Sequence, residues 1–255
     1  MRFAALASGS SGNCFAIEKN NKIVLIDTGI TCKQTLLRLE NLNLNPKNID
    51  SIFITHEHHD HIRGLNVLKK KTNADIFMTR KTFLNSTLDI DDKNINFIKN
   101  NETIKRAGFE INAFSKNHDC ADPVSFLING SNSLAVLTDI GVACNNVIDA
   151  VKEADSVILE SNHDEYVLQK GNYPEVLKKR ILSEKGHLSN KQASLLVLEH
   201  ARQKLNNLVL AHLSINNNTE TLAYNNMASI LKHKKSFKPR VFISNRQRET
   251  SLLRV

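Results

Sequence analysis

The strongest constraint on the fold is the segment "THEHHDH" at residues 55–61, which begins at the last residue of the apolar stretch "SIFIT". A short apolar run rich in β-branched residues predicts a buried strand, so these polar side chains leave the strand together in one loop. The four potential metal ligands in the loop are His56, His58, Asp60 and His61. Imidazole together with carboxylate suits Zn²⁺ or, with more oxygen, Mn²⁺ or Fe²⁺. The pattern therefore predicts a metal site in place of a chance surface cluster.

Other apolar runs predict further strands, namely "RFAALAS", "KIVLIDTG", "DIFMT", "VSFLI", "SLAVLTD", "SVILES" and "NLVLAH". Helical patterns lie between several of them, at residues 32–42, 62–71, 174–182 and 189–205. Close-set strands at the start, followed by alternation of strand and helix, predict an α/β fold with a mixed sheet or pair of sheets and helices packed outside. Because no linker, repeat or low-complexity block interrupts the chain, we expect one domain over residues 1–255.

The remaining polar candidates also follow predicted strands. Asp27, His56, Asp139, Glu160 and His212 each stand at the C-terminal end of an apolar run. Strand ends are where α/β proteins place their sites. The sequence therefore predicts that these five side chains meet.

Charge and composition bear on the partner and the compartment. The 34 Lys and Arg against 26 Asp and Glu give a formal charge of +8, which suits a polyanion such as nucleic acid. Basic clusters lie at residues 69–71, 178–180 and 232–240, although each alone is typical of a solvated surface. No secretory signal and no membrane-spanning stretch is recognised, and the four scattered cysteines form no CxxC pair. We therefore expect a cytoplasmic protein with free thiols.

Five segments in order, "LIDTG", "THEHHDH", "KNHD", "LTDIG" and "LAHLS", resemble the motifs of the metallo-β-lactamase superfamily and span residues 25–214. Four more, "ASGSSGNC", "LESNHD", "YPEVLKKRILSEKGHLSN" and "AHLSINNN", are similar to its bacterial YycJ/WalJ-type branch. The resemblance covers nearly the whole chain. It implies an αββα sandwich fold and 5′-to-3′ DNA exonuclease activity on single- or double-stranded DNA.

The resemblance also implies two divalent ions per chain, Zn²⁺ or Mn²⁺, with Fe²⁺ also compatible. One ion would be held by His56, His58 and His118, and the other by Asp60, His61 and His212. Asp139 would bridge the two. Asp27 is interpreted as a carboxylate that accepts N–H bonds from the ligand histidines. Taken singly, His118, Asp139 and His212 are also ordinary polar residues at loops and strand ends, and Asp27 also suits a turn.

Three further roles concern catalysis. Two metal ions supply a hydroxide and stabilise phosphoryl charge, and Asp60 is expected both to bind metal and to accept a proton from the attacking water. His187 resembles an active-site histidine of the related tRNA 3′-processing endonucleases, and Glu160 would orient it. His163 is a weaker candidate in the same segment. The alternative for His187 is a residue that merely precedes the helix cap Ser189.

The segment "SGSSGN" is most simply a hairpin turn, as Gly and Ser favour, and the alternative is a phosphate-binding loop with contacts from Ser10, Ser11 and Asn13. The polar run at residues 216–218 is expected beside the same pocket. Two other functions remain open: a small-molecule hydrolase of the same fold, such as a glyoxalase-II-like thioesterase or a cyclic phosphodiesterase, and a non-catalytic binding module. The module is disfavoured because every ligand position is filled.

Overall fold

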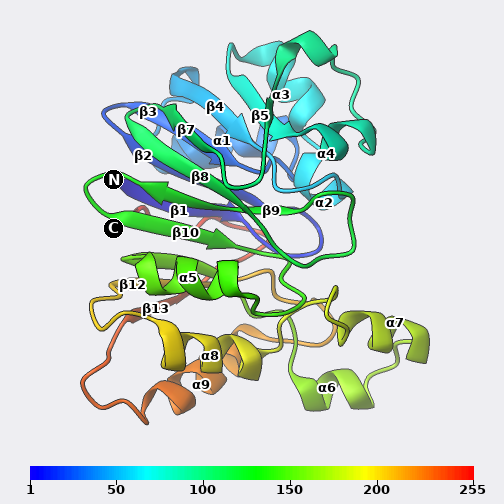
Figure 1. The fold of residues 1–255 in the computed structure, drawn as a ribbon, viewed down its shortest axis with the longest axis vertical. Helices are drawn as coiled ribbons and strands as arrows, with labels where there is room; N and C mark the ends of the chain where they lie inside the picture. The colour runs from blue at the N-terminus through cyan, green and yellow to red at the C-terminus, as the bar shows by residue number, and fades with distance from the viewer.

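The computed structural model describes residues 1–255 and contains two seven-stranded sheets that face each other, with helices on the outer faces (Figure 1). The first sheet has the order β14-β1-β2-β3-β4-β5-β6. Its strands are β1 (Arg2–Ala7), β2 (Cys14–Lys19), β3 (Lys22–Ile26), β4 (Ile49–Phe53), β5 (Asp75–Thr79), β6 (Ile95–Ile98) and β14 (Leu253–Arg254). The strands from β3 to β6 are parallel, and the others pair antiparallel.

The second sheet has the order β13-β12-β11-β10-β9-β8-β7. Its strands are β7 (Thr103–Arg106), β8 (Phe109–Ser115), β9 (Val124–Asn129), β10 (Ser133–Leu137), β11 (Ser156–Glu160), β12 (Asn207–Ala211) and β13 (Arg240–Ile243). The strands from β10 to β13 are parallel, and β7, β8 and β9 continue the sheet antiparallel. Both sheets are therefore mixed, which confirms the predicted fold class.

Helices cover both outer faces. The first sheet carries α1 (Cys32–Asn41), α2 (His59–Ile62), α3 (Leu65–Lys71) and α4 (Arg80–Leu84), and the second carries α5 (Asn145–Glu153), α8 (Asn190–His200) and α9 (Glu220–Leu231) (Figure 1). The helices α6 (Glu165–Lys170) and α7 (Glu175–Ile181) stand to one side of the second layer (Figure 1). Two short 3-10 turns, η1 (Pro46–Asn48) and η2 (Asp92–Asn94), complete the secondary structure.

Three apolar clusters fill the spaces between the four layers. Strand β3 contributes to two of these clusters. Val24 and Ile26 pack between the sheets, while Ile23 and Leu25 pack under the first helical layer. Successive strand residues point to opposite faces, so a strand buried on both faces must be apolar throughout. This explains the continuous apolar runs that the sequence shows.

Two further observations concern the whole chain. No helix is both long and apolar enough to cross a membrane. All four cysteines are free, and Cys14 and Cys32 are buried.

Candidate metal centre

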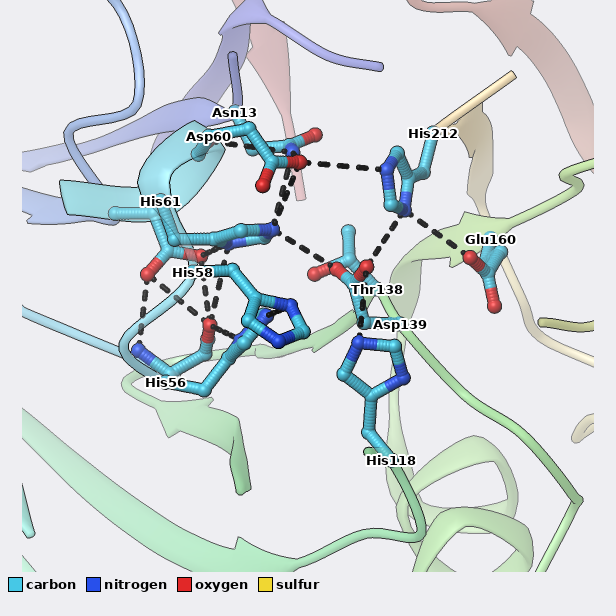
Figure 2. Close-up of polar contacts among 12 residues, drawn as sticks. Asn13, His56, His58, Asp60, His61, His118, Thr138, Asp139, Glu160 and His212 are labelled. Atoms are coloured by element: carbon cyan, nitrogen blue, oxygen red, sulfur yellow. Dashed lines mark hydrogen bonds and ion pairs between the residues drawn. The ribbon is translucent and has the colours of Figure 1, made fainter. Parts of the chain in front are cut away.

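The candidate site lies where five parallel strands end, two from the first sheet and three from the second. Strands β3 and β4 lead into Asp27 and His56, and strands β10, β11 and β12 lead into Asp139, Glu160 and His212. Because each group of strands is parallel, its carboxyl ends reach the same edge of its sheet. The two edges meet, and the structure brings the predicted side chains together (Figure 2).

Left-handed backbone geometry directs three of these side chains. Asp27, Asp139 and His212 have φ angles of 61°, 55° and 54°. Residues other than glycine rarely adopt this region, and such strain persists only where the surroundings fix it. Here the Asp27 amide donates to the Phe53 carbonyl over 2.8 Å, and the His212 amide donates to Ser8 Oγ over 2.8 Å. The chain therefore turns sharply at each strand end and points the side chain into the site.

The first group of donors consists of His56, His58 and His118, whose nitrogen atoms lie within 4.8 Å of one another. His56 Nε2 is 3.1 Å from His58 Nδ1. The opposite nitrogen of His56 lies 2.8 Å from Thr55 Oγ1, and His118 Nδ1 donates to the Gly186 carbonyl over 3.2 Å. These bonds fix the ring orientations and leave Nε2 of both His56 and His118 facing the centre.

The second group consists of Asp60, His61, Asp139 and His212. His61 Nε2 lies 3.1 Å from Asp139 Oδ2 and 3.5 Å from Asp60 Oδ2. His212 Nε2 lies 3.7 Å from Asp60 Oδ2, and its Nδ1 lies 3.0 Å from Asp139 Oδ1 (Figure 2). The Asp139 carboxylate thus stands between the two groups, since its Oδ1 also lies 3.8 Å from His118 Nε2.

Asp27 lies behind this group and is fully buried. Its Oδ2 is 2.8 Å from His61 Nδ1, and both of its oxygens accept from the Thr55 hydroxyl. A carboxylate in this position holds Nδ1 of His61 as a donor, so Nε2 is the nitrogen that faces the site, 3.1 Å from Asp139 Oδ2 and 3.1 Å from Asn13 Nδ2. The contact agrees with the interpretation of Asp27 as a residue that orients a ligand.

The donor set fits a divalent cation. Asp139 Oδ2 is buried and makes no hydrogen bond, although His61 Nε2 is only 3.1 Å away. Burying a carboxylate oxygen without a partner costs free energy of folding. A cation bound by both this oxygen and the facing imidazole would offset that cost. Nitrogen and oxygen donors without sulfur suit Zn²⁺, Mn²⁺ or Fe²⁺.

The electrostatics of the cluster agree with this fit. Burial raises the pKa of Asp139, but the imidazoles of His212 and His61 outweigh it and hold the pKa well below its usual range. Burial lowers the pKa of His212, but the Asp139 and Glu160 carboxylates raise it to about 10. With no cation bound, His212 therefore carries a proton that balances the carboxylates, and binding of a cation would release it. Burial lowers the pKa of His118 to about 4, so this ring stays neutral, as a metal ligand requires.

Glu160 connects the candidate metal centre to His187. Its Oε1 is 2.8 Å from His187 Nδ1 and 3.1 Å from His212 Nδ1, while its Oε2 accepts from the Ile140 and Leu188 amides. Burial raises the pKa of Glu160, but His187 and His212 lower it to about 2, so the carboxylate is ionised. Its position agrees with the predicted orienting role.

A cavity of about 290 Å³ opens above the cluster. His58, Asp60, His118, Asp139, His187 and His212 line its polar side. Tyr173, Leu177 and Ile181, on and beside α7, line the other side and form an apolar wall. His187 keeps 19% of its side chain exposed there, so its free ring nitrogen can reach a bound molecule.

Two predicted residues do not take their expected places. His163 is fully buried, does not line the cavity, and neither ring nitrogen has a hydrogen-bond partner. Its backbone pairs with Ser189 in an isolated bridge, and burial lowers its pKa to about 4. This placement gives no support to a catalytic role for His163, which stays a prediction. Asn13 is also fully buried, and its side chain bonds Ser8, Gly9 and Asp60, so it joins two loops and does not face a phosphate.

Of the other predicted phosphate contacts, one lies at the cavity and one does not. Ser10 lines the cavity, whereas Ser11 is exposed and lies outside it. In the run at residues 216–218, Asn217 and Asn218 are buried, and Asn218 bonds the carbonyls of residues 161 and 162. Only Asn216 is exposed, and it donates to the Tyr173 hydroxyl over 2.9 Å. Small polar residues in this protein serve more often to connect loops than to face the cavity.

The three basic clusters do not all lie at the site. Residues 69–71 precede β5, and residues 232–240 lead into β13, so both clusters lie at the amino ends of parallel strands, opposite the site. Only the cluster at residues 178–180 borders the cavity, through Arg180. The other two clusters lie away from the cavity, because the amino and carboxyl ends of a strand are separated by the length of the strand.

Several site residues were not recognised in the sequence. Thr55 bonds both Asp27 and His56, and its only signal was its position directly before the histidine motif. Lys116 is buried and donates to the Thr138 carbonyl next to Asp139. Arg180 forms an ion pair with Asp119, which follows the donor His118. These contacts join distant segments, so local sequence carried no sign of the last two.

Gly29 holds the two loops of the site in contact, because a Cβ atom there would lie 1.6 Å from the Asp60 carbonyl oxygen and 2.6 Å from the Asn13 amide. We expect Gly29→Ala to displace the histidine loop, to reduce metal content and to lower the unfolding temperature by roughly 3–10 °C, as overpacking of about 1–3 kcal/mol does in a chain of this size. Calorimetry and elemental analysis test this. In the control Gly130→Ala, the nearest atom lies at 3.6 Å, so a similar loss there would contradict the argument.

Comparison with known proteins shows the family of the chain. The family model described as the metallo-beta-lactamase superfamily matches residues 7–116. The chain is 34% identical over 241 residues to exodeoxyribonuclease YycJ of Bacillus anthracis, covering 92% of this chain and 90% of the relative. It is 34% identical over 236 residues to exodeoxyribonuclease WalJ of Streptococcus pneumoniae, covering 90% and 88%.

Among solved structures, Zn²⁺-bound PqqB of Methylobacterium extorquens aligns with a TM-score of 0.73 at 13% identity, over 98% of this chain and 100% of that one. This likeness concerns the fold alone. With the two sheets, the strand-end donors and the identity to two curated relatives in agreement, the chain belongs to the metallo-β-lactamase superfamily, in the group of the YycJ and WalJ exodeoxyribonucleases.

Proposed function

We propose that this hydrolase is a metal-dependent 5′-to-3′ DNA exonuclease. One observation carries the proposal: a complete His and Asp donor cluster stands at the strand ends of a chain that is 34% identical, over 92% of its length, to an exodeoxyribonuclease. We also propose that residues 1–255 act as one domain, since β14 at the C-terminus pairs with β1 at the N-terminus in the same sheet.

The proposed metal ligands are those implied by the motifs. His56, His58 and His118 would hold one ion, Asp60, His61 and His212 would hold the other, and Asp139 would touch both. When bound, the two ions would act as Lewis acids on the phosphodiester and lower the pKa of a water molecule. Zn²⁺ and Mn²⁺ are the proposed ions, because nitrogen and oxygen donors without sulfur suit both.

Two side chains of the cavity would handle protons. Asp60, with 23% of its side chain exposed, would accept a proton from the attacking water. His187 has its Nδ1 fixed by Glu160, so its Nε2 would carry the proton that neutralises the phosphate or protonates the leaving oxygen. Glu160 is a positioning residue in this scheme, because its oxygens are occupied by His187, His212 and two backbone amides.

The cavity walls suit a nucleotide better than a small acyl substrate. The polar side would face the phosphodiester, and the α7 side would offer the Tyr173 ring and the Leu177 and Ile181 side chains to a sugar or base. Base stacking on an aromatic ring contributes about 1–3 kcal/mol and tolerates any sequence. We therefore expect little sequence preference.

The test of the proposed function uses metal-loaded protein and DNA labelled at one end. Stepwise release of nucleotides from the 5′ end is expected, faster with a 5′-phosphate and slower as salt rises, because the strand is held through its charges. Product sizing on linear single- and double-stranded DNA and on a circular strand of equal composition measures this.

Two outcomes would contradict the proposal. Cleavage of the circle at a comparable rate would identify an endonuclease. If all DNAs stay intact while an acyl-glutathione analogue is hydrolysed, the protein is a small-molecule hydrolase of the same fold.

A further inference from the structure

A second cavity, of about 280 Å³, adjoins the metal cavity. It lies between the end of β1 and the loops that follow β12 and β13, and Ser214 lines both cavities. The two cavities are therefore neighbours at the carboxyl edge of the strands. Nothing in the proposed reaction uses the second one.

Arg246 is the one basic residue that lines this second cavity. Its guanidinium donates a single hydrogen bond, from Nη2 to the Leu213 carbonyl, and forms no ion pair. Glu220 is the one acidic residue of the lining, and its Oε1 accepts from the Asn245 amide, 2.5 Å away. A guanidinium has five N–H donors, so most of those on Arg246 are free to bind an anion.

Arg246 is held in place at its side chain by the close approach of Gly9 and at its backbone carbonyl by Arg38. A Cβ atom on Gly9 would lie 2.8 Å from Arg246 Nε, and Gly9 has a φ angle of 136°, so only glycine leaves room for this side chain. The Arg246 carbonyl accepts from Arg38 Nη2 over 3.0 Å, and the buried Arg38 also donates to the Leu6 carbonyl over 2.7 Å. A side chain positioned in this way loses little freedom when it binds a ligand.

The other lining groups also suit a phosphate. The Ser214 and Thr219 hydroxyls and the Gln247 side-chain amide line the cavity, and none of them donates a hydrogen bond within the protein. Ser8, Ser244 and Asn218 also line it, but their donors are used by Asn13, by the Leu210 carbonyl and by the carbonyls of residues 161 and 162. Leu213 and Ile215 are the two apolar residues of the lining, so the cavity offers little surface for a base. A fixed guanidinium among small polar groups is typical of a phosphate site, since its planar fork matches phosphate oxygens.

We propose that this second cavity, through Arg246, binds a phosphate of the DNA strand next to the phosphate being hydrolysed. The inference rests on the proposed nuclease function and extends it. Tyr173 supports the path of the strand, because it lines the metal cavity while its hydroxyl accepts from Asn216 in the loop that also carries Ser214. The strand would pass from the α7 wall, over Ser214, to Arg246. The bound group is either the terminal 5′-monophosphate or the next internal diester.

The test compares Arg246→Gln with the control Arg248→Gln, which removes the same charge from an exposed residue outside the second cavity. Metal-loaded protein binds a 5′-phosphorylated single strand with phosphorothioate linkages, which keep their charges but resist hydrolysis, and fluorescence anisotropy gives Kd. We expect Arg246→Gln to raise Kd about 10- to 100-fold, as loss of a charge-assisted hydrogen bond does, and to reduce the salt slope of log Kd by roughly 0.7. Arg248→Gln should bind within about 2-fold of the wild type.

Single modifications of the strand identify the phosphate. One oligonucleotide lacks the 5′-phosphate, and others carry one neutral methylphosphonate at the first, second or third linkage. The wild type should lose affinity for the strand that lacks the bound phosphate, and Arg246→Gln should show no further loss for that same strand. If Arg246→Gln binds equally well with and without the 5′-phosphate, Arg246 binds the terminal group. If Arg246→Gln is instead unaffected by one of the methylphosphonates, Arg246 binds that internal diester.

An unchanged Kd for Arg246→Gln, or the same losses as the wild type on every modified strand, would overturn the inference. Because binding is measured without cleavage, these results do not depend on catalysis. If the wild type binds DNA through Arg246 yet releases no nucleotides, the exonuclease proposal fails and the phosphate site stands.

Discussion

Asp139→Ala is expected to remove most of the bound metal and to lower DNA hydrolysis by about 10³-fold or more. Asp139 lies between the two donor groups, 3.1 Å from His61 Nε2 and 3.8 Å from His118 Nε2, so its loss affects both ions. Metal ions contribute several kcal/mol of charge stabilisation to the transition state, and each 1.36 kcal/mol corresponds to a factor of ten in rate. Elemental analysis should find close to two divalent ions per wild-type chain.

Asp149→Ala is the matched control for this prediction, since Asp149 lies on α5 with 70% of its side chain exposed. It should keep both the metal and the activity. A wild-type protein that is fully folded, active and free of metal would contradict the mechanism as a whole. An Asp139→Ala variant that keeps both ions would show that the histidines and Asp60 hold them without Asp139.

His187→Ala is expected to lower turnover by roughly 10² to 10⁴, the range of general acid–base groups, while metal content stays unchanged. The reason is geometric: Glu160 holds Nδ1 of His187 over 2.8 Å, and the ring borders the metal cavity. Single-turnover kinetics together with elemental analysis separate the two effects. His200→Ala is the control, because His200 ends α8 away from the cavity.

Two results would change the role of His187. Loss of metal in His187→Ala would show that His187 is a metal ligand. The geometry allows this, because its donor atom lies within 4.8 Å of those of Asp139, Glu160 and His212. Unchanged turnover would leave His187 as a residue that merely precedes the helix cap Ser189. In that case the proton for the leaving oxygen has another source.

Secondary structure was predictable where strands are buried on both faces. The runs that became β3, β10, β11 and β12 are almost wholly buried, and their apolar sequences reflect this. The predicted runs did not include β2 and β8, which lie inside the sheets, or β6, β7, β13 and β14, which are the four edge strands. Edge strands face solvent and carry charged side chains, so the apolar signal that marks a strand is weak there.

Among the helices, α8 was predicted from the sequence and α9 was not. The regular apolar spacing in residues 189–205 predicted α8, and its start at Ser189 is a capping box with Gln192. Helix α9 (Glu220–Leu231) buries only Ala223, Met227 and Leu231, so its apolar stripe is narrow, and the sequence did not single it out. A narrow stripe becomes recognisable as a helix face only once the sheet that it covers is known.

The sequence by itself determined the chemistry of the centre, because histidine and aspartate at strand ends specify nitrogen and oxygen donors, and parallel strands align those ends. Only the tertiary structure decided which side chains face the cavity. It turned His163 into the interior, used Asn13 to join two loops, and separated two basic clusters from the site. It also placed Arg246 against Gly9, residues that lie at opposite ends of the chain. Contacts of this kind depend on how two whole sheets pack together, and no local run of residues encodes that packing.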